Sequence, residues 1–233
     1  MENQILSRGI TDSIKKNKTV FAPGCGLMLY KPESARKLHF LLNDFFDGID
    51  DFHICCHHNP HFINETLVIN ICPGCDKRFR NDYDNTTTIS LWEILADNGF
   101  FTFPDYHGIS MSILDACPTR DQERVHNAVR KLLRRMNITL VEPKNTGTRS
   151  TCCGDSFFGL IPAEKLKEQM KKRASEMPAK DVVVYCVSCI KSMHIGEKKP
   201  HYLIDLIFGE ETIPGTFEPE EWHKELDNYI DLH

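Results

Sequence analysis

The ten cysteines of this 233-residue chain form one pattern that occurs twice. Each copy has a single cysteine, then an adjacent pair, then two cysteines separated by two residues, giving C-x29-CC-x15-C-x2-C and C-x34-CC-x32-C-x2-C. The copies consist of Cys25, Cys55, Cys56, Cys72 and Cys75, and of Cys117, Cys152, Cys153, Cys186 and Cys189. Thiolates are soft ligands that hold zinc or iron–sulfur clusters. Each copy is therefore a candidate metal site.

The adjacent pair and the number of thiols indicate which metal. Five thiols exceed the four that a tetrahedral zinc ion takes. Successive residues of an extended chain point to opposite sides, so an adjacent pair chelates one ion poorly but reaches different irons of a cluster. The pattern favours an iron–sulfur cluster in each copy. A zinc site and a dithiol or disulfide site are the alternatives that the spacing leaves open.

The composition excludes several other classes of protein. The chain has 33 acidic and 28 basic residues, a net charge of −5 that gives no reason to expect nucleic acid or an acidic membrane surface. The N-terminus has no basic region followed by a long apolar run, and apolar stretches end well before the roughly 18 residues of a membrane span. We expect a cytoplasmic protein, where thiols stay reduced and a dense cysteine set indicates metal or redox chemistry.

Alternating strands and helices are expected to position the cysteines. Apolar runs predict strands at residues 19–23, 52–54, 67–71, 139–141 and 181–185. Helical spacing predicts helices from Pro32, with Leu38, Leu42 and Phe45 on the inner face, over Val125–Met136, over 163–177 and around 203–207. This alternation predicts parallel α/β sheets, in which ligands gather beyond the carboxyl ends of the strands.

The duplicated pattern also predicts the division of the chain. We expect an N-terminal arm at 1–18, a first half-domain at 19–110, a second at 111–210 and a C-terminal tail at 211–233. The aromatic-rich stretch 99–116 is expected to connect the halves, and Trp222 to anchor the tail.

The C…CC…CxxC pattern, with Cys152-Cys153-Gly154 in the second copy, resembles the cysteine-rich CCG domain. Two copies in one chain resemble the B subunit of heterodisulfide reductase, over roughly residues 19–209. The resemblance implies two Rossmann-like half-domains related by a pseudo-twofold axis, with two noncubane [4Fe–4S] clusters at their interface, each held by all five cysteines of its copy. It also implies an oxidoreductase that cleaves a disulfide between the clusters into two thiols by one-electron steps, with a ferredoxin or an iron–sulfur or flavin subunit as electron donor.

The first copy departs from the family pattern. Only 15 residues separate its adjacent pair from its C-x2-C, and His57 stands where the family has glycine. The missing segment is expected to line the substrate cleft in the family. We therefore expect the first cluster to be more exposed, to differ in type or to serve another substrate.

Four further residues are candidates for catalysis. His57 and His58 follow the first adjacent pair and titrate near neutral pH, so they are candidate proton donors to a leaving thiolate. Arg149 and Lys191 flank second-copy cysteines and are candidates for binding an anionic coenzyme. Solvated loop and helix positions are the alternative for all four.

Two other functions are also open, an electron-relay subunit beside a flavin dehydrogenase and a zinc-bound structural module.

Overall fold

The computed structural model of the chain describes residues 12, 14, 18–97, 99 and 101–233. Most of the expected N-terminal arm at 1–18 lies outside the described residues. The chain divides into two compact units. The first unit contains the described residues up to Thr102 together with Leu226–His233, and the second unit contains Phe103–Glu225. Among the described residues, no helix is both long and apolar enough to cross a membrane.

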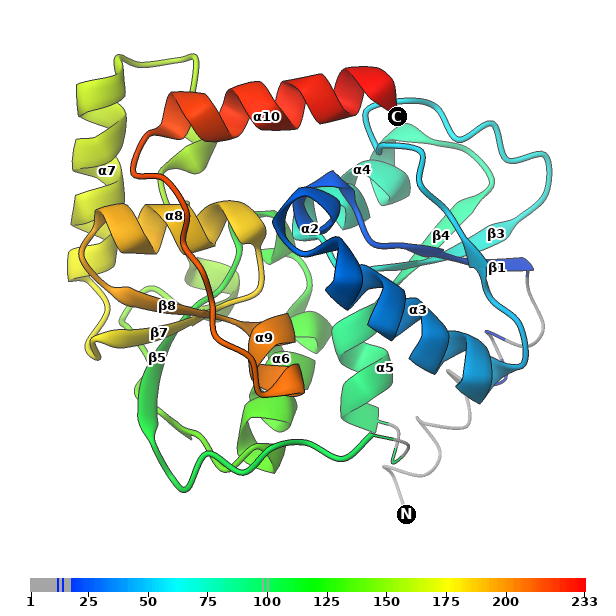
Figure 1. Ribbon diagram of the computed structural model, residues 1–233, viewed down its shortest axis with the longest axis horizontal. Coiled ribbons are helices and arrows are strands. Elements are labelled where there is room, and N and C mark those ends of the chain that lie inside the picture. Colours follow the sequence, from blue (N-terminus) through cyan, green and yellow to red (C-terminus); the bar gives the residue numbers. More distant parts are fainter. Residues whose placement is uncertain (1–11, 13, 15–17, 98, 100) are drawn as a thin grey trace. The chain divides into compact units, whose positions relative to one another are not determined.

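The first unit is built on a parallel sheet of four strands in the order β2-β1-β3-β4 (Figure 1). The strands are β1 (Lys18–Ala22), β2 (Asp50–Asp51), β3 (Thr66–Asn70) and β4 (Thr86–Ser90). The helices between and after them are α2 (Cys25–Tyr30), α3 (Pro32–Phe46), α4 (Pro73–Asp82) and α5 (Leu91–Asp97). Strand β3 pairs with β1 on one side and with β4 on the other, so its five residues are all buried.

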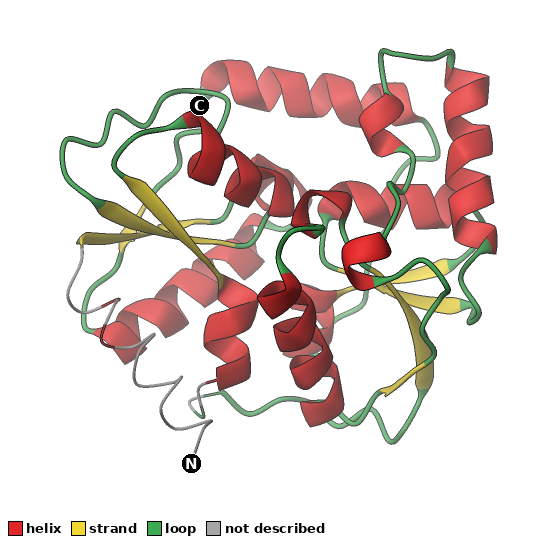
Figure 2. Cartoon of the chain, turned by 180° about the vertical axis from the view of Figure 1, so that it is seen from behind, coloured by secondary structure: helices red, strands yellow, loops and turns green. Residues whose placement is uncertain are grey.

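The second unit repeats this topology in a parallel sheet of order β6-β5-β7-β8. Its strands are β5 (Ser110–Leu114), β6 (Thr139–Leu140), β7 (Asp181–Val184) and β8 (Lys199–Tyr202). Its helices are α6 (Glu123–Arg135), α7 (Ala163–Ser175), α8 (Val187–Ile195), α9 (Leu203–Phe208) and α10 (Pro219–Leu232), with 3-10 turns η1 (Cys117–Thr119), η2 (Gly147–Arg149) and η3 (Asp155–Phe157). Figure 2 separates these helices from the strands by colour. The boundary between the units falls within α10.

The predicted α/β class with parallel sheets in two similar halves is confirmed. In both sheets the chain first adds a strand on one side of the first strand and then moves to the other side. This reversal is the position at which parallel sheets bind ligands, beyond the strand ends. The pseudo-twofold relation of the halves and clusters at their interface stay predictions.

Helical spacing predicted the buried faces of two second-unit helices correctly. In α6, Val125, Val129 and Leu132 are at most 3% exposed, and in α7, Leu166 and Met170 are 1% exposed. Most charged residues of both helices lie on the opposite face, as in amphipathic helices, although Arg173 of α7 is buried. The prediction for α3 was wrong at one position, because Phe45 is 37% exposed and the neighbouring Phe46 is buried instead.

Four other expectations need correction. The expected connector 99–116 contains β5, the central strand of the second sheet, in which Met111, Ile113 and Leu114 are buried. The strand expected at 52–54 lies at Asp50–Asp51. Strands β4 and β8 were missed, because β4 has one apolar residue among three threonines and a serine, and so shows no apolar run, and β8 contains a proline. The expected tail at 211–233 contains helix α10, on which Trp222 is buried.

Candidate functional site

The cysteines of each copy follow the carboxyl ends of the sheet strands. Cys25 comes three residues after β1, and Cys72 two residues after β3. Cys117 and Cys186 follow β5 and β7 in the same way. These are the two central strands of each sheet, on either side of the topological reversal. The fold therefore brings the first cysteine and the C-x2-C motif of each copy to one edge of its sheet.

In the first unit the five sulfurs form a continuous series of contacts. The Sγ atoms of Cys25 and Cys55 are 3.9 Å apart. Cys55 also contacts Cys56, which contacts Cys75, and Cys75 contacts Cys72. The five thiols of the first copy are thus neighbours in one group at the edge of the sheet.

The second unit repeats the series position by position. Cys117 contacts Cys152, Cys152 contacts Cys153, Cys153 contacts Cys189, and Cys189 contacts Cys186. Each contact corresponds to one in the first unit. Two sequence copies with different spacers therefore arrive at the same order of sulfurs.

The first two thiols of each series have pKa values that shift in the same directions in both units. The hydrogen bond between Cys25 and Cys55 raises the pKa of Cys25 and lowers that of Cys55. The bond between Cys117 and Cys152 likewise raises the pKa of Cys117 and lowers that of Cys152.

Backbone and hydroxyl donors face several of these sulfurs. Cys72 is the N-cap of α4. The side chain and the N–H of Cys75 and the N–H of Gly74 form hydrogen bonds with the Cys72 sulfur. These bonds lower the pKa of Cys72 to about 7, although burial acts to raise it. Near Cys152, the N–H of Gly154 donates to Sγ at 3.3 Å. Helix α4 begins at Pro73, so Cys75 lies in its first turn. Backbone N–H donors at a helix N-terminus stabilise an anionic cluster.

Two serines in the second unit also contact sulfur. The hydroxyl of Ser156 lies 2.9 Å from Cys152 Sγ. The Ser192 hydroxyl donates to Cys153 Sγ at 3.3 Å. Neither serine was singled out from the sequence. Helical periodicity places Ser192 near the C-x2-C motif, because it stands one turn after Cys189 on α8.

Gly24 allows the backbone to approach the first group closely. Its φ is +79°, and a Cβ at this position would lie 3.2 Å from both Cys72 Cβ and Cys75 Sγ. A side chain there would occupy the space beside two of the five thiols. This is the close approach to a bulky group for which glycine suits.

The two groups suit a cluster by their chemistry. Ten thiols in two sets of five, with donors beside them, match the thiolate ligation of iron–sulfur clusters. Among the described residues, no three or more His, Cys, Asp or Glu side chains are arranged to hold a metal ion. The match with iron and sulfide therefore rests on the number, softness and grouping of the sulfurs.

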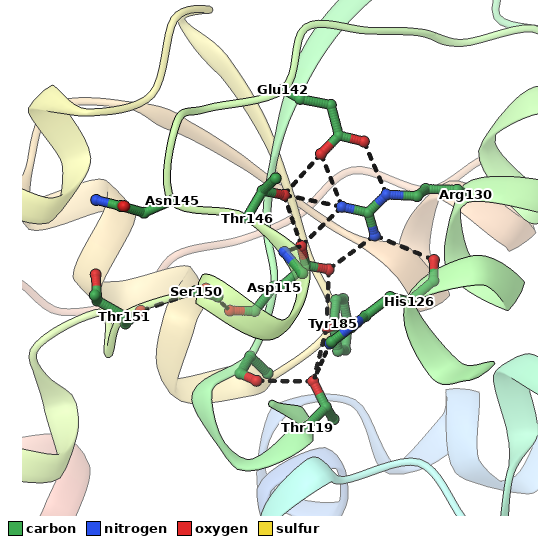
Figure 3. Close-up of polar contacts among 12 residues, drawn as sticks. Asp115, Thr119, His126, Arg130, Glu142, Asn145, Thr146, Ser150, Thr151 and Tyr185 are labelled. Carbon is green, nitrogen blue, oxygen red and sulfur yellow. Dashed lines mark hydrogen bonds and ion pairs between the residues drawn. The ribbon is translucent and has the colours of Figure 1, made fainter. Parts of the chain in front are cut away.

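A buried ionic network supports the second group (Figure 3). The Asp115 carboxylate, 1% exposed, accepts bonds from both terminal nitrogens of Arg130 at 3.0 and 2.8 Å. It also accepts bonds from the Thr146 hydroxyl at 2.8 Å, the Gly147 N–H at 2.6 Å and the Tyr185 hydroxyl at 3.1 Å. Burial opposes ionisation, but Arg130 and the other donors lower the pKa of Asp115 to about 2.

This network joins the three segments that carry the second group. Asp115 stands two residues before Cys117, and Tyr185 directly precedes Cys186. The Ser150 hydroxyl, two residues before Cys152, donates to the Asp115 carbonyl at 2.6 Å. At the positions that correspond to Asp115 and Tyr185, the first unit has a proline and an isoleucine. The first group therefore lacks this particular support.

The first group is instead covered by the end of α10. The N–H of Cys55 donates to the His233 carbonyl at 3.2 Å, and His58 Nε2 donates to the Ile230 carbonyl at 2.9 Å. Tyr229 lines the pocket beside Cys25 and Cys55. Three cysteines of the first group are buried, compared with two of the second, and this argues against a more exposed first cluster.

The other candidate residues occupy different environments. His57 and His58 are exposed, and the His57 N–H bonds to Cys55. Arg149 is exposed on η2. Lys191 donates from Nζ to the Pro214 carbonyl at 3.1 Å and lies 5.1 Å from the centre of the Trp222 ring. The contacts of Lys191 make it part of the packing around α10.

Comparison with known proteins identifies part of the second unit. Residues 111–194 match the family model of the cysteine-rich domain CCG. The match begins in β5, ends near the end of α8, and includes all five cysteines of the second copy. No match was found among curated proteins or among solved structures. The chain thus contains one CCG domain, a type of domain common in iron–sulfur oxidoreductases.

Proposed function

We propose that the chain is an iron–sulfur oxidoreductase that reduces a small disulfide to two thiols. Each group of five cysteines would hold one [4Fe–4S] cluster of the noncubane kind. The observation that carries this proposal is the shared order of sulfur contacts in the two units. A single ion would need four of the five thiols and would give no reason for a fifth thiol in the series of both groups.

The proposed reaction takes R–S–S–R′, two electrons and two protons to R–SH and R′–SH. The sulfur–sulfur bond breaks and two S–H bonds form. A bound cluster supplies one-electron transfer to or from sulfur. The electrons come from a ferredoxin or from an iron–sulfur or flavin subunit, because the chain has no ferredoxin-like C-x2-C-x2-C-x3-C run. No covalent change of the chain is required.

The chain's own residues have supporting roles in this proposal. The Ser192 hydroxyl donates to a second-group sulfur, the Ser156 hydroxyl lies within hydrogen-bond distance of another, and backbone N–H groups donate to both groups, so negative charge on sulfur is stabilised. His57 is exposed beside the first adjacent pair and is our candidate proton donor. Arg149 and Lys191 stay weaker candidates, since Lys191 is engaged in packing.

A second candidate function is electron relay beside a flavin dehydrogenase. The covered first group favours it, because a shielded centre suits electron transfer better than substrate binding. A zinc-bound structural module is the third alternative, since thiolates bind zinc equally readily.

Metal analysis of protein purified without oxygen separates these functions. We expect about eight irons and equivalent sulfide per chain for two four-iron clusters. A disulfide reductase should show a thiol-dependent paramagnetic signal after oxidation, whereas the spectra of a relay should ignore added thiols. One or two zinc ions in a colourless protein would instead identify the structural module.

A variant tests whether the groups are separate. Cys153→Ala should reduce the iron content to about half, because the contacts of Cys153 are with cysteines of its own group. Loss of all iron would contradict separate ligation by the two units.

A further inference from the structure

An open pocket adjoins the second group of cysteines. Its volume is about 510 Å³, and Cys152 and Ser156 line it beside Arg120 and Lys172. Cys152 is only half-buried, and the Ser156 hydroxyl lies 2.9 Å from its Sγ. A small molecule in this pocket would therefore lie against a sulfur of the group.

The charge of the pocket lining is positive. Arg120 and Lys172 are exposed, and neither side chain has an ion pair or hydrogen bond within the part of the chain that the structure describes. Arg173 also lines the pocket, but it is buried and paired with Glu176. The remaining pair of cations is available to a ligand. Guanidinium and ammonium groups form charge-assisted bonds with carboxylates, phosphates and sulfonates.

The sequence difference between the copies explains the wall of this pocket. Lys172 lies on α7 and Ser156 on η3, and both elements belong to the 32 residues between Cys153 and Cys186. The first copy has only 15 residues at this place and forms no counterpart of α7. The longer spacer of the second copy thus supplies much of the pocket wall.

The pocket beside the first group of cysteines has no cationic lining. Phe52, Phe79 and Tyr229 line it, and no Lys or Arg does so among the described residues. The end of α10 covers this group through the contacts of Cys55 and His58. An anionic ligand therefore has no partner charge there.

We propose that the two groups have different roles, with an anionic thiol or disulfide binding only beside Cys152 through Arg120 and Lys172. The first group exchanges electrons and does not meet the substrate. This inference rests on the proposed function for its redox part, whereas the binding part concerns the pocket alone. The ligand is a small sulfur compound that carries a carboxylate, phosphate or sulfonate.

The binding part is tested with 3-mercaptopropionate and its neutral counterpart 3-mercapto-1-propanol on the full chain, purified without oxygen. Calorimetry should show tighter binding of the anionic thiol. Lys172→Gln should weaken that binding about five- to tenfold, the effect of one charge-assisted bond at an exposed site, and leave the neutral thiol unchanged. Lys171→Gln is the matched control, an exposed α7 lysine outside the pocket lining, and should change neither.

Competition with simple anions tests whether the pocket binds the carboxylate of 3-mercaptopropionate, and it needs no iron spectroscopy. Inorganic phosphate or acetate should displace 3-mercaptopropionate, and displacement by either supports the pocket. Equal affinity for the two thiols, or equal effects of Lys171→Gln and Lys172→Gln, would overturn it. Because calorimetry needs no iron signal, a protein that lacks iron but passes this test would refute the proposed function and not the pocket.

The division of roles is tested with equivalent cysteines. Cys56 and Cys153 occupy the same place in the two series of contacts. Cys56→Ala should retain the paramagnetic signal induced by 3-mercaptopropionate, and Cys153→Ala should lose it, with iron measured in both. Loss of the signal in both variants, or in Cys56→Ala alone, would mean that the first group also meets the substrate.

Discussion

Replacing Asp115 by Asn should destabilise the second unit by about 3 kcal/mol. The pKa of Asp115 is lowered from 3.8 to about 2, which at 1.36 kcal/mol per pKa unit contributes about 2.4 kcal/mol to folding. Breaking a buried ion pair costs about 3–5 kcal/mol, because the partner charge, here Arg130, loses its counterion. The expected loss of about 3 kcal/mol lies between these two values.

The pH dependence has a defined sign. Because the folded pKa of Asp115 lies below the unfolded one, its contribution is present in full above about pH 4 and is lost as the pH falls toward 2. At pH 7 the carboxylate is ionised in both states, so the comparison of variants is made there. Asp115→Asn protein should also lose the acid-dependent part of its stability.

Hydrogen exchange at pH 7 measures the loss of stability of the second unit separately from that of the first. Exchange of amides in β5 and β7 should be about 100-fold faster in Asp115→Asn, since each 1.4 kcal/mol is a factor of ten. Glu142→Gln is the control, because Glu142 accepts from the same Arg130 at 2.8 Å but is 37% exposed and should cost less than about 1 kcal/mol. Equal acceleration in the two variants would refute the assignment of Asp115 as the centre of the network.

Three further substitutions have defined outcomes. Gly24→Ala should cost about 1–3 kcal/mol and lower the iron bound by the first group, whereas Gly48→Ala, also at positive φ but with nothing within 4 Å, should keep that iron. Tyr83→Phe removes the 2.7 Å bond to the Cys56 carbonyl and should cost about 1 kcal/mol in denaturant unfolding. Trp222→Ala should cost about 3–5 kcal/mol in thermal unfolding, because the indole is 4% exposed; an unchanged midpoint would contradict its role as an anchor.

Local sequence patterns predicted the parts of the fold that depend on local burial. Val68 and Val183 lie in continuous apolar runs, and such runs form buried parallel strands. The same reasoning missed β8, because Pro200 argues against a strand and only the neighbouring β7 shows that the position is an edge. It also misplaced β5, whose alternating serines and apolar residues lie within a stretch rich in aromatics.

Of the candidate site, the sequence predicted only the grouping of the cysteines. The spacing of the cysteines grouped them correctly, since the repeat itself carries that information. The support of Cys117 by Asp115 and the cover over Cys55 by His233 depend on contacts across 35 and 178 residues of sequence. No periodic pattern indicates such contacts. For the same reason the cationic residues Arg120 and Lys172 were not distinguished from other exposed charges.

The division of α10 between the units has a consequence for biogenesis. Tyr229 and Ile230, which close over the first group, are translated only after the entire second unit has been made. On the ribosome, the five thiols of the first group consequently exist for a time without their lid. Under the proposed function, iron and sulfide delivered in that interval would reach the first group before the end of α10 covers it.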